Sequence, residues 1–255
     1  MTSLRARAMA GEPVHGAFMV EFLTPGLPRI LANAGCEFAL YDMEHTGASF
    51  ETLKMLVAAG QGLPMAPMCR VPRGRYHFLA RALDIGMHGV MVPMVESEDE
   101  ARAIAEAVRY PPAGRRGAAF GFAHDGFSPG DPAAKAAEAD ARTLLIAQIE
   151  TERGLENVEA IAAVPGIDVL WVGHFDLTNF LGVPGNFEGE VYVNALRRIA
   201  AAAKTHGKGL GILGGDAAWL ERHRAMGFNM LAAGVDPALL IQGLNGILDP
   251  MRSPS

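Results

Sequence analysis

The sequence predicts an α/β fold, a TIM-type (β/α)8 barrel, and two observations lead to this prediction. Short apolar segments alternate with longer amphipathic segments along the chain, and there are eight of the short ones. Such alternation is typical of a parallel sheet covered by helices, and eight units favour closure into a barrel. The length of 255 residues suits one domain of this kind, so we expect residues 1–255 to form a single barrel.

The eight apolar segments are the predicted strands. They are residues 17–21, 38–42, 64–70, 89–93, 144–150, 169–173, 209–213 and 230–234. Most of them are followed by a stretch with helical periodicity, as a barrel of β/α units requires.

Serine residues mark the start of two predicted helices. Ser49 precedes residues 50–57, in which Leu53, Leu56 and Val57 share one face, and Ser97 precedes an acidic first turn that complements the helix dipole. Further helices are predicted at residues 152–163, 192–205, 217–226 and 237–248. Residues 110–135 are rich in Pro and Gly and fit no element, so we interpret them as a long functional or mobile loop.

Composition excludes several classes of protein. The net charge of −6 gives no electrostatic basis for binding nucleic acid, and no segment approaches the roughly 18 apolar residues of a membrane span. Cys36 and Cys69 are too few for a disulfide framework and do not have the spacing of a zinc site. We therefore expect a cytoplasmic protein with reduced thiols.

Polar side chains gather where the predicted strands end. Asp42, Glu44 and His45 follow the second strand, Arg70 ends the third, and the fifth ends in Gln148-Ile149-Glu150. Asp176 comes shortly after the sixth strand. Because the carboxyl ends of barrel strands surround one mouth, we expect these side chains to converge there.

Glu150 and Asp176 are the candidate metal ligands. They lie 26 positions apart, about one β/α unit, so they belong to neighbouring strands. Two adjacent carboxylates repel each other unless a cation lies between them, and hard oxygen ligands suit Mg²⁺ or Mn²⁺. Taken alone, each acid could equally form a surface salt bridge or cap a helix. Asp42 at a strand end could be structural, Arg70 could pair with any of these acids, and a lone His45 could be an ordinary polar residue.

The order and spacing of several motifs together resemble those of the HpcH/HpaI family of class II pyruvate aldolases, on a barrel of the phosphoenolpyruvate/pyruvate type. The resemblance covers residues 16 to about 240. It rests on the segments Tyr41-Asp42-Met43-Glu44-His45, Cys69-Arg70-Val71, Val92-Pro93-Met94-Val95, 110–117, Gln148-Ile149-Glu150-Thr151, 173–178 and Gly211-Ile212-Leu213.

The resemblance implies a role for each residue of the candidate site. Glu150 and Asp176 match the protein ligands of a divalent metal (Mg²⁺, Mn²⁺ or Co²⁺), and His45 matches the catalytic base, held and polarised by Asp42. Arg70 matches the residue that holds the 2-oxo acid and stabilises charge on its oxygen. The residues that match further contacts to the substrate are Gln148, Gly173, His174 and Phe175. Glu44 remains without an assigned role.

The reaction implied by the resemblance joins pyruvate or hydroxypyruvate reversibly to an aldehyde, and cleaves 4-hydroxy-2-oxo acids, through a metal-stabilised enolate. An imidazole titrates near neutral pH and can therefore move the C4 hydroxyl proton in either direction. Three departures concern the substrate rather than the metal or the base. His174-Phe175 replace the family's Pro and its following residue, Arg116-Gly117-Ala118-Ala119 replace Arg-Gly-x-Gly, and Phe18 replaces an early Trp.

Two other functions are compatible with the sequence. The wider superfamily includes CoA-thioester lyases of the citryl- and malyl-CoA type, although no basic nucleotide-binding patch is evident here. A catalytically inactive barrel that only binds an oxo acid is the third possibility, and the intact set of candidate residues argues against it. The resemblance also implies a homo-hexamer, a trimer of dimers, in which the C-terminal helix and tail at residues 237–255 pack on a neighbouring subunit.

Overall fold

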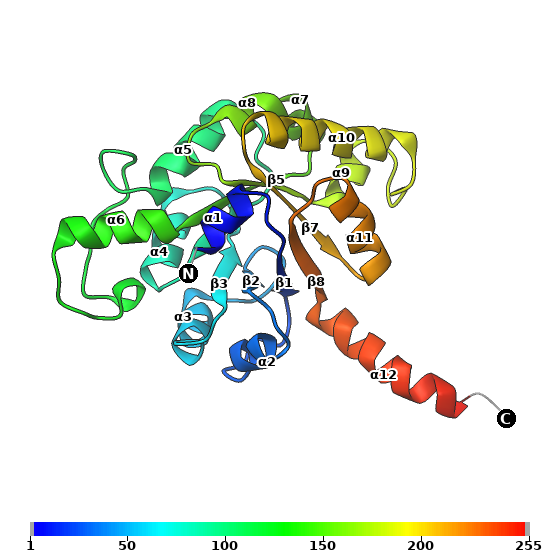
Figure 1. Cartoon of the computed structure of the whole chain (residues 1–255), viewed down its shortest axis with the longest axis horizontal. Helices are drawn as coiled ribbons and strands as arrows, with labels where there is room; N and C mark the ends of the chain where they lie inside the picture. The colour runs from blue at the N-terminus through cyan, green and yellow to red at the C-terminus, as the bar shows by residue number, and fades with distance from the viewer. Residues whose placement is uncertain (1–2, 253–255) are drawn as a thin grey trace.

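Eight parallel strands close into a barrel in which each strand pairs with the next and β8 pairs with β1 (Figure 1). The computed structural model describes residues 3–252. The strands are β1 (Val14–Met19), β2 (Phe38–Asp42), β3 (Ala66–Arg70), β4 (Gly89–Val92), β5 (Leu144–Ile149), β6 (Val169–Val172), β7 (Gly209–Gly214) and β8 (Met230–Val235). The predicted fold class is therefore confirmed.

The first strand shows the largest error in the predicted bounds. It was expected at residues 17–21 but occupies Val14–Met19, because Val20 and Glu21 leave the sheet. Their backbone N–H groups donate to the carboxylate of Asp236, at 2.8 and 3.0 Å, instead of to a strand. A side chain more than two hundred residues away thus ends the strand, and this contact is not visible in the local sequence.

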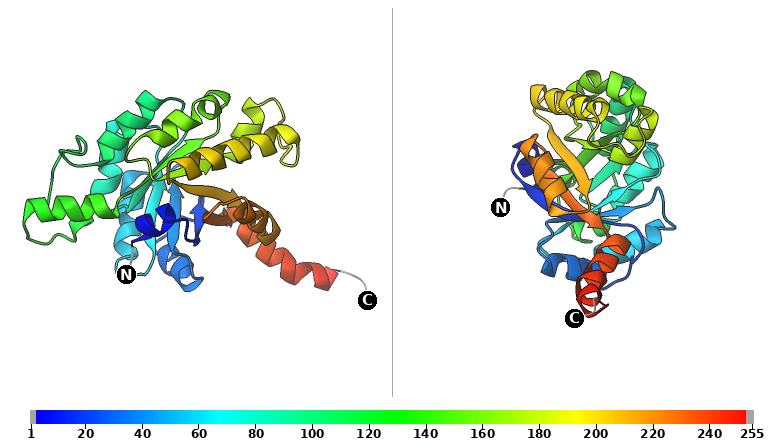
Figure 2. Two further views of the ribbon diagram at one scale, coloured as in Figure 1. Left: turned by 45° about the horizontal axis from the view of Figure 1, so that its top comes forward. Right: turned by 90° about the vertical axis from the view of Figure 1, so that its right-hand side faces the viewer.

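Helices cover the outside of the barrel (Figures 1 and 2). They are α1 (Leu4–Met9), α2 (Leu27–Asn33), α3 (Phe50–Ala59), α4 (Tyr76–Asp84), α5 (Glu98–Val108), α6 (Pro132–Arg142), α7 (Glu152–Glu156), α8 (Val158–Ala163), α9 (His174–Phe180), α10 (Glu190–Thr205), α11 (Ala217–Ala225) and α12 (Asp236–Arg252). No helix within residues 3–252 is long and apolar enough to cross a membrane.

Local signals account for where several helices begin. The hydroxyls of Ser49 and Ser97 each accept a backbone N–H from the first turn, as predicted for N-caps. The helix expected at residues 152–163 is instead two short helices, because Asn157 turns its side-chain amide to the carbonyls of Glu96 and Arg153. The expected loop at residues 110–135 contains a short 3-10 turn (Ala123–Asp125) and ends where Asp131 caps α6.

Two apolar layers lie on the two sides of the sheet. Side chains alternate along each strand, so one set fills the barrel and the other packs against the helices. The inner set includes Phe38, Leu40, Met68 and Trp171. Trp171 needs Gly211 on the adjacent strand, because a Cβ at position 211 would overlap the indole ring. Because these side chains fill its interior, the barrel has a packed core and not a central channel.

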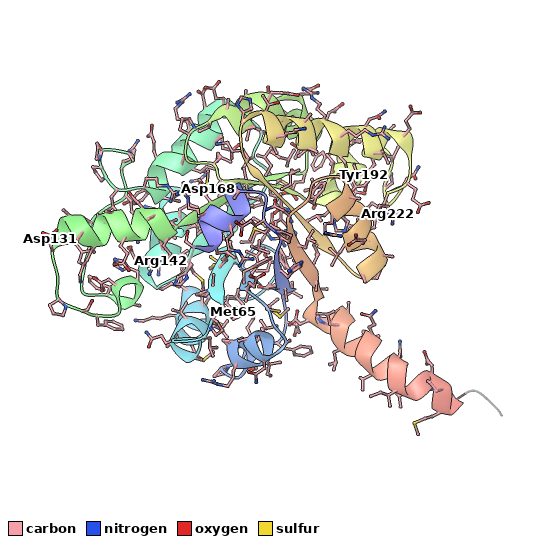
Figure 3. The ribbon with its side chains drawn as sticks, viewed as in Figure 1. Met65, Asp131, Arg142, Asp168, Tyr192 and Arg222 are labelled. Atoms are coloured by element: carbon pink, nitrogen blue, oxygen red, sulfur yellow. The ribbon has the colours of Figure 1, made fainter. Side chains whose placement is uncertain are left out.

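A buried ionic cluster closes the amino-terminal end of the barrel. Asp168, just before β6, accepts hydrogen bonds from Arg5 at 2.8 Å and Arg109 at 2.9 Å, and from the Leu145 N–H at 2.9 Å. Arg5 belongs to α1, which lies across this end beside Asp168 (Figure 3). The opposite end of the barrel carries the polar strand ends.

The last helix, α12, extends away from the barrel (Figures 1 and 2). Five of its large apolar side chains are exposed, namely Leu240, Ile241, Leu244, Ile247 and Met251. The helix begins one residue earlier than predicted and continues to Arg252. The last part of the expected tail, residues 253–255, lies outside the described residues.

Candidate functional site

A cavity of about 410 Å³ opens at the carboxyl ends of the strands. It is lined by nearly all of the residues selected from the sequence: Asp42, His45, Arg70, Gln148, Gly173, His174, Phe175 and Asp176. Apolar side chains complete its wall, among them Phe18, Trp171 and Leu213. The expected convergence of strand ends on one mouth is therefore observed.

Glu150 lies immediately behind this wall, where Gly173 makes room for it. A Cβ at position 173 would overlap the Glu150 carboxylate and crowd the Gln148 amide. The carboxylate accepts the Met94 backbone N–H at 2.8 Å and a hydrogen bond from the Gln148 side-chain nitrogen. Met94 itself has a left-handed backbone with φ of 51°, which is uncommon for a residue other than glycine. The surroundings thus fix Glu150 in one position.

The charge of Glu150 is poorly compensated. Burial, followed by the charges of Glu44 and Asp176, raises the pKa of Glu150 to about 7, although the Met94 N–H and Arg70 act in the opposite direction. Asp176 is half-buried in the first turn of α9. Asp176 is therefore close enough for its charge to act on Glu150, as two ligands of one cation must be.

The oxygen atoms at this position fit a hard divalent cation. Besides the carboxylates of Glu150 and Asp176, the side-chain oxygen Oε1 of Gln148 is buried without a hydrogen-bond partner within the described chain. Mg²⁺ is commonly held by one or two carboxylates and completes its shell with water and substrate oxygens. No group of three His, Cys, Asp or Glu residues within residues 3–252 forms a preassembled metal cage. The donor set therefore suits Mg²⁺ or Mn²⁺ better than zinc.

Asp42 and Arg70 form the rigid part of the site. The fully buried Asp42 carboxylate accepts a hydrogen bond from Nε of Arg70 at 2.7 Å and from the backbone N–H groups of Glu44 and His45, at 3.0 and 3.1 Å. Burial alone would raise the pKa of Asp42, but Arg70 and these N–H groups hold it below its ordinary value. The pair fixes both the guanidinium and the turn that follows β2.

The position of the His45 ring differs from the expected one. Asp42 contacts the backbone N–H of His45 and not its imidazole, which is 63% exposed. The nearest carboxylate oxygen to His45 Nε2 belongs to Glu44, at 3.7 Å, and the same oxygen lies 3.1 Å from Nη1 of Arg70. Glu44, which the sequence left without a role, therefore lies between the candidate base and the candidate substrate-binding arginine.

Aromatic side chains form one wall of the mouth. The His174 ring packs against Phe175, Phe187 and Trp219, with ring centroids 4.6–5.4 Å apart. Burial, with a smaller contribution from His223, lowers the pKa of His174 to about 4, so this imidazole is neutral at physiological pH. His174 thus acts as part of an apolar wall and is unsuited to proton transfer at neutral pH.

Asp236 is a residue of the mouth that the sequence analysis missed. Its carboxylate accepts three backbone N–H groups, from Val20, Glu21 and Phe22, at 2.6–3.0 Å. It thereby fixes the segment that follows β1 beside the cavity. The only local signal is its position directly after the last strand and before Pro237.

Comparison with known proteins gives a consistent family. A family model described as HpcH/HpaI aldolase/citrate lyase matches residues 20–243. A hydroxypyruvate/pyruvate aldolase of Roseovarius nubinhibens is 33% identical over 91% of this chain and 90% of the relative. A 5-keto-4-deoxy-D-glucarate aldolase of Salmonella arizonae is 31% identical over 96% of this chain and 95% of the relative. The crystal structure of an HpcH/HpaI aldolase from Desulfitobacterium hafniense covers 100% of this chain and 99% of its own, with a TM-score of 0.92 and 28% identity.

The raised pKa of Glu150 predicts how pH affects the stability of the metal-free protein. Unfolding returns the carboxyl to its ordinary pKa near 4.3, so its contribution to stability is fully present below that value and is lost as pH rises to about 7. This loss corresponds to about 4 kcal/mol at one pKa unit per 1.36 kcal/mol.

Glu150→Gln should therefore raise the free energy of unfolding of the metal-free protein at pH 8 and flatten its pH dependence. Urea denaturation at pH 5.5 and pH 8 measures both effects. Glu152→Gln, which changes an exposed acid on the same segment, is the matched control. Equal destabilisation of both variants at pH 8 would contradict the prediction.

Proposed function

The chain belongs to the HpcH/HpaI aldolase/citrate lyase family and is a carbon–carbon lyase of the aldolase type, and we propose that it is a metal-dependent class II aldolase. Its reaction reversibly joins pyruvate or hydroxypyruvate to an aldehyde and cleaves 4-hydroxy-2-oxo acids. The observation that carries this proposal is the pair Glu150 and Asp176, poorly compensated in charge, beside Arg70 and His45 in one mouth.

Glu150 and Asp176 would hold the divalent cation, Mg²⁺, Mn²⁺ or Co²⁺. When bound, the cation supplies Lewis-acid stabilisation of negative charge on the oxygen atoms of the oxo acid. Gln148 orients the Glu150 carboxylate through its side-chain nitrogen, and Gly173 leaves the space in which that carboxylate lies. The two neighbours thus keep Glu150 in place whether or not substrate is present.

Arg70 would hold the oxo acid and stabilise the charge that develops on its ketone oxygen. Asp42 binds Nε of Arg70 and Glu44 lies beside Nη1, so the guanidinium is oriented before substrate arrives. It also stacks over the ring of Phe18, with its Cζ 4.8 Å from the ring centroid. A guanidinium that is already oriented in this way can stabilise a transition state without the free-energy cost of reorienting during the reaction.

His45 would transfer the proton of the C4 hydroxyl group of the substrate. In cleavage its imidazole accepts the C4 hydroxyl proton as the C3–C4 bond breaks, and in synthesis it returns that proton. We propose that Glu44 positions the imidazole, because its carboxylate and not that of Asp42 lies nearest to the ring. Asp42 then acts on His45 only through the backbone of the turn.

The oxo-acid carboxylate would bind beside Gly173, where the first turn of α9 leaves the backbone N–H groups of His174 and Phe175 without intrahelical partners. The aromatic wall formed by His174 and Phe175 is one part of the mouth where the sequence departs from the family pattern. We propose that it selects the aldehyde.

A cytoplasmic location is proposed from the two free thiols, of which Cys69 is buried in the core.

We propose that α12 packs on a second copy of the chain, within a homo-hexamer arranged as a trimer of dimers. The helix extends from the barrel (Figure 2). It exposes the side chains of Leu240, Ile241, Leu244 and Ile247. A row of this kind is typical of a helix that is covered by a partner.

Metal dependence is the first test of this function. Excess EDTA should abolish cleavage of a 4-hydroxy-2-oxo acid, and Glu150→Gln or Asp176→Asn should lower kcat at least about 100-fold, because each removes a ligand of the stabilising cation. Activity is measured with coupled pyruvate detection and restored with Mg²⁺, Mn²⁺ or Co²⁺. Full activity in EDTA would refute the metal mechanism.

Two further outcomes would point to the alternative functions. Turnover of CoA thioesters instead of oxo acids would indicate a CoA-thioester lyase, and no exchange of pyruvate α-protons with solvent would indicate a catalytically inactive barrel that only binds an oxo acid.

The roles of His45 and Glu44 are tested by kinetics over a range of pH. His45→Ala should lower kcat by about 10²–10⁴ while divalent metal affinity is unchanged, because only proton transfer is lost. Glu44→Gln should cause a smaller loss of kcat at every pH, because the imidazole loses the carboxylate that positions it. Asp42→Asn would instead raise KM through Arg70. An unchanged turnover of His45→Ala would exclude it as the base.

The role of α12 is tested by mass measurement. Leu244→Glu together with Ile247→Glu should reduce the mass found by light scattering, because two charges are placed in the proposed interface. Lys204→Glu, an exposed charge change on α10, is the control. A monomeric unaltered chain, or an unchanged mass of the double variant, would overturn this assignment.

A further inference from the structure

A second cavity, of about 460 Å³, lies at the opposite end of the strands from the catalytic mouth. It lies between the end of α3, the residues that precede β3 and β4, and the 123–131 segment with α6. Figure 3 labels Met65, Arg142 and Asp131 on this side of the barrel. We call it the lower cavity, and we propose that it is a binding site for a small monocarboxylic acid with an apolar body. This proposal is independent of the proposed aldolase function.

The lower cavity cannot be an extension of the catalytic mouth. Met65 precedes β3 and lines the lower cavity, whereas Arg70 ends the same strand and lines the mouth. At roughly 3.3 Å per residue the two ends of this strand are about 15 Å apart, with the filled barrel core between them. A ligand in the lower cavity would therefore not touch the catalytic residues.

Arg142 is the group that requires a partner there. It is half-buried at the end of α6, and one of its terminal nitrogens donates to the His124 carbonyl at 2.7 Å. Its Nε is buried without a hydrogen-bond partner, and no carboxylate oxygen within residues 3–252 lies within 4.0 Å of it. By contrast, the well-buried guanidinium groups of Arg70, Arg109 and Arg116 each pair with a carboxylate. The charges of Glu138 and Asp125 act on Arg142 only from beyond that distance. A bound anion in direct contact would therefore give this partly desolvated guanidinium the close partner that it lacks.

Two histidines provide additional donors beside Arg142. His124 is 95% buried, and neither ring nitrogen makes a hydrogen bond of ordinary geometry within the described residues, although one faces the Asp84 backbone. His88 also lines the cavity, and burial and the charge of Arg142 lower its pKa to about 4. Both rings are therefore neutral at physiological pH and can each donate one N–H to a carboxylate.

The remaining walls define the class of anion. Val57, Leu63, Met65 and Pro67 provide an apolar surface for the body of the ligand. Lys135 is already neutralised by Asp125 at 2.6 Å, and the exposed acids Asp131 and Glu138 lie at the rim. These acids would repel a multiply charged phosphate more than a single carboxylate. One unpaired guanidinium, two neutral donors and an apolar wall thus favour a monocarboxylate.

Calorimetric titration with hexanoate tests this assignment. The whole protein is used with Mg²⁺ and saturating pyruvate, so that the catalytic mouth is occupied. Hexanoate should bind with one site per chain, and inorganic phosphate should bind at least about tenfold more weakly. Arg142→Gln should weaken hexanoate binding at least about tenfold, since it removes the charge that the carboxylate meets. Arg197→Gln, an exposed arginine on α10, should bind hexanoate as the unaltered chain does.

A second variant protects the test against a folding defect at Arg142. Ala134→Trp places a large ring on the exposed start of α6, at the edge of the lower cavity, and should also block hexanoate while leaving the thermal midpoint and the aldolase rate unchanged. The proposal is overturned if hexanoate does not bind, if pyruvate displaces it, if phosphate binds as tightly, or if Ala134→Trp binds it normally.

Discussion

The catalytic mouth depends on one constraint, the burial of the Glu150 carboxylate behind Gly173. Two hydrogen bonds hold this carboxylate, and no cationic side chain contacts it within the described residues, while Glu44 and Asp176 add negative charge nearby. In the absence of a cation, burial and the neighbouring negative charges oppose ionisation of Glu150, so that its carboxyl is partly protonated at neutral pH. A divalent cation between Glu150 and Asp176 would resolve this conflict, which is why we propose these two residues as its ligands.

The second organising feature is that Asp42 and Glu44, at the end of β2 and just after it, contact different partners. Asp42 fixes Arg70 and the turn backbone, and none of the hydrogen bonds that its carboxylate accepts comes from the His45 ring. Glu44 therefore occupies the place between the imidazole and the guanidinium. A substrate that engages both His45 and Arg70 would therefore contact two side chains that lie on either side of the Glu44 carboxylate.

Much of this could be predicted from the sequence, because the barrel depends on repeating local patterns. The eight apolar segments predict the strands, and the positions of Glu150, Asp176 and Arg70 at or just after strand ends predict that they lie at one mouth. Contacts between distant segments could not be predicted. Asp236 ends β1 from the far end of the chain, and the direction of the His45 ring depends on a turn set by Asp42. The lower cavity was also missed, since His88, His124 and Arg142 come from separate elements with no shared pattern.

The two ends of the barrel therefore serve different purposes. The amino-terminal end is closed by the Asp168 cluster and by α1, and this leaves the opposite end free for chemistry. The central claim is that Glu150 and Asp176 together hold one divalent cation. Crystals grown with Mn²⁺ and pyruvate test it most directly, through anomalous scattering at the manganese absorption edge. The account predicts one peak, within coordination distance of a carboxylate oxygen from each of the two residues. A peak on other residues, or no peak in a folded protein saturated with Mn²⁺, would contradict it.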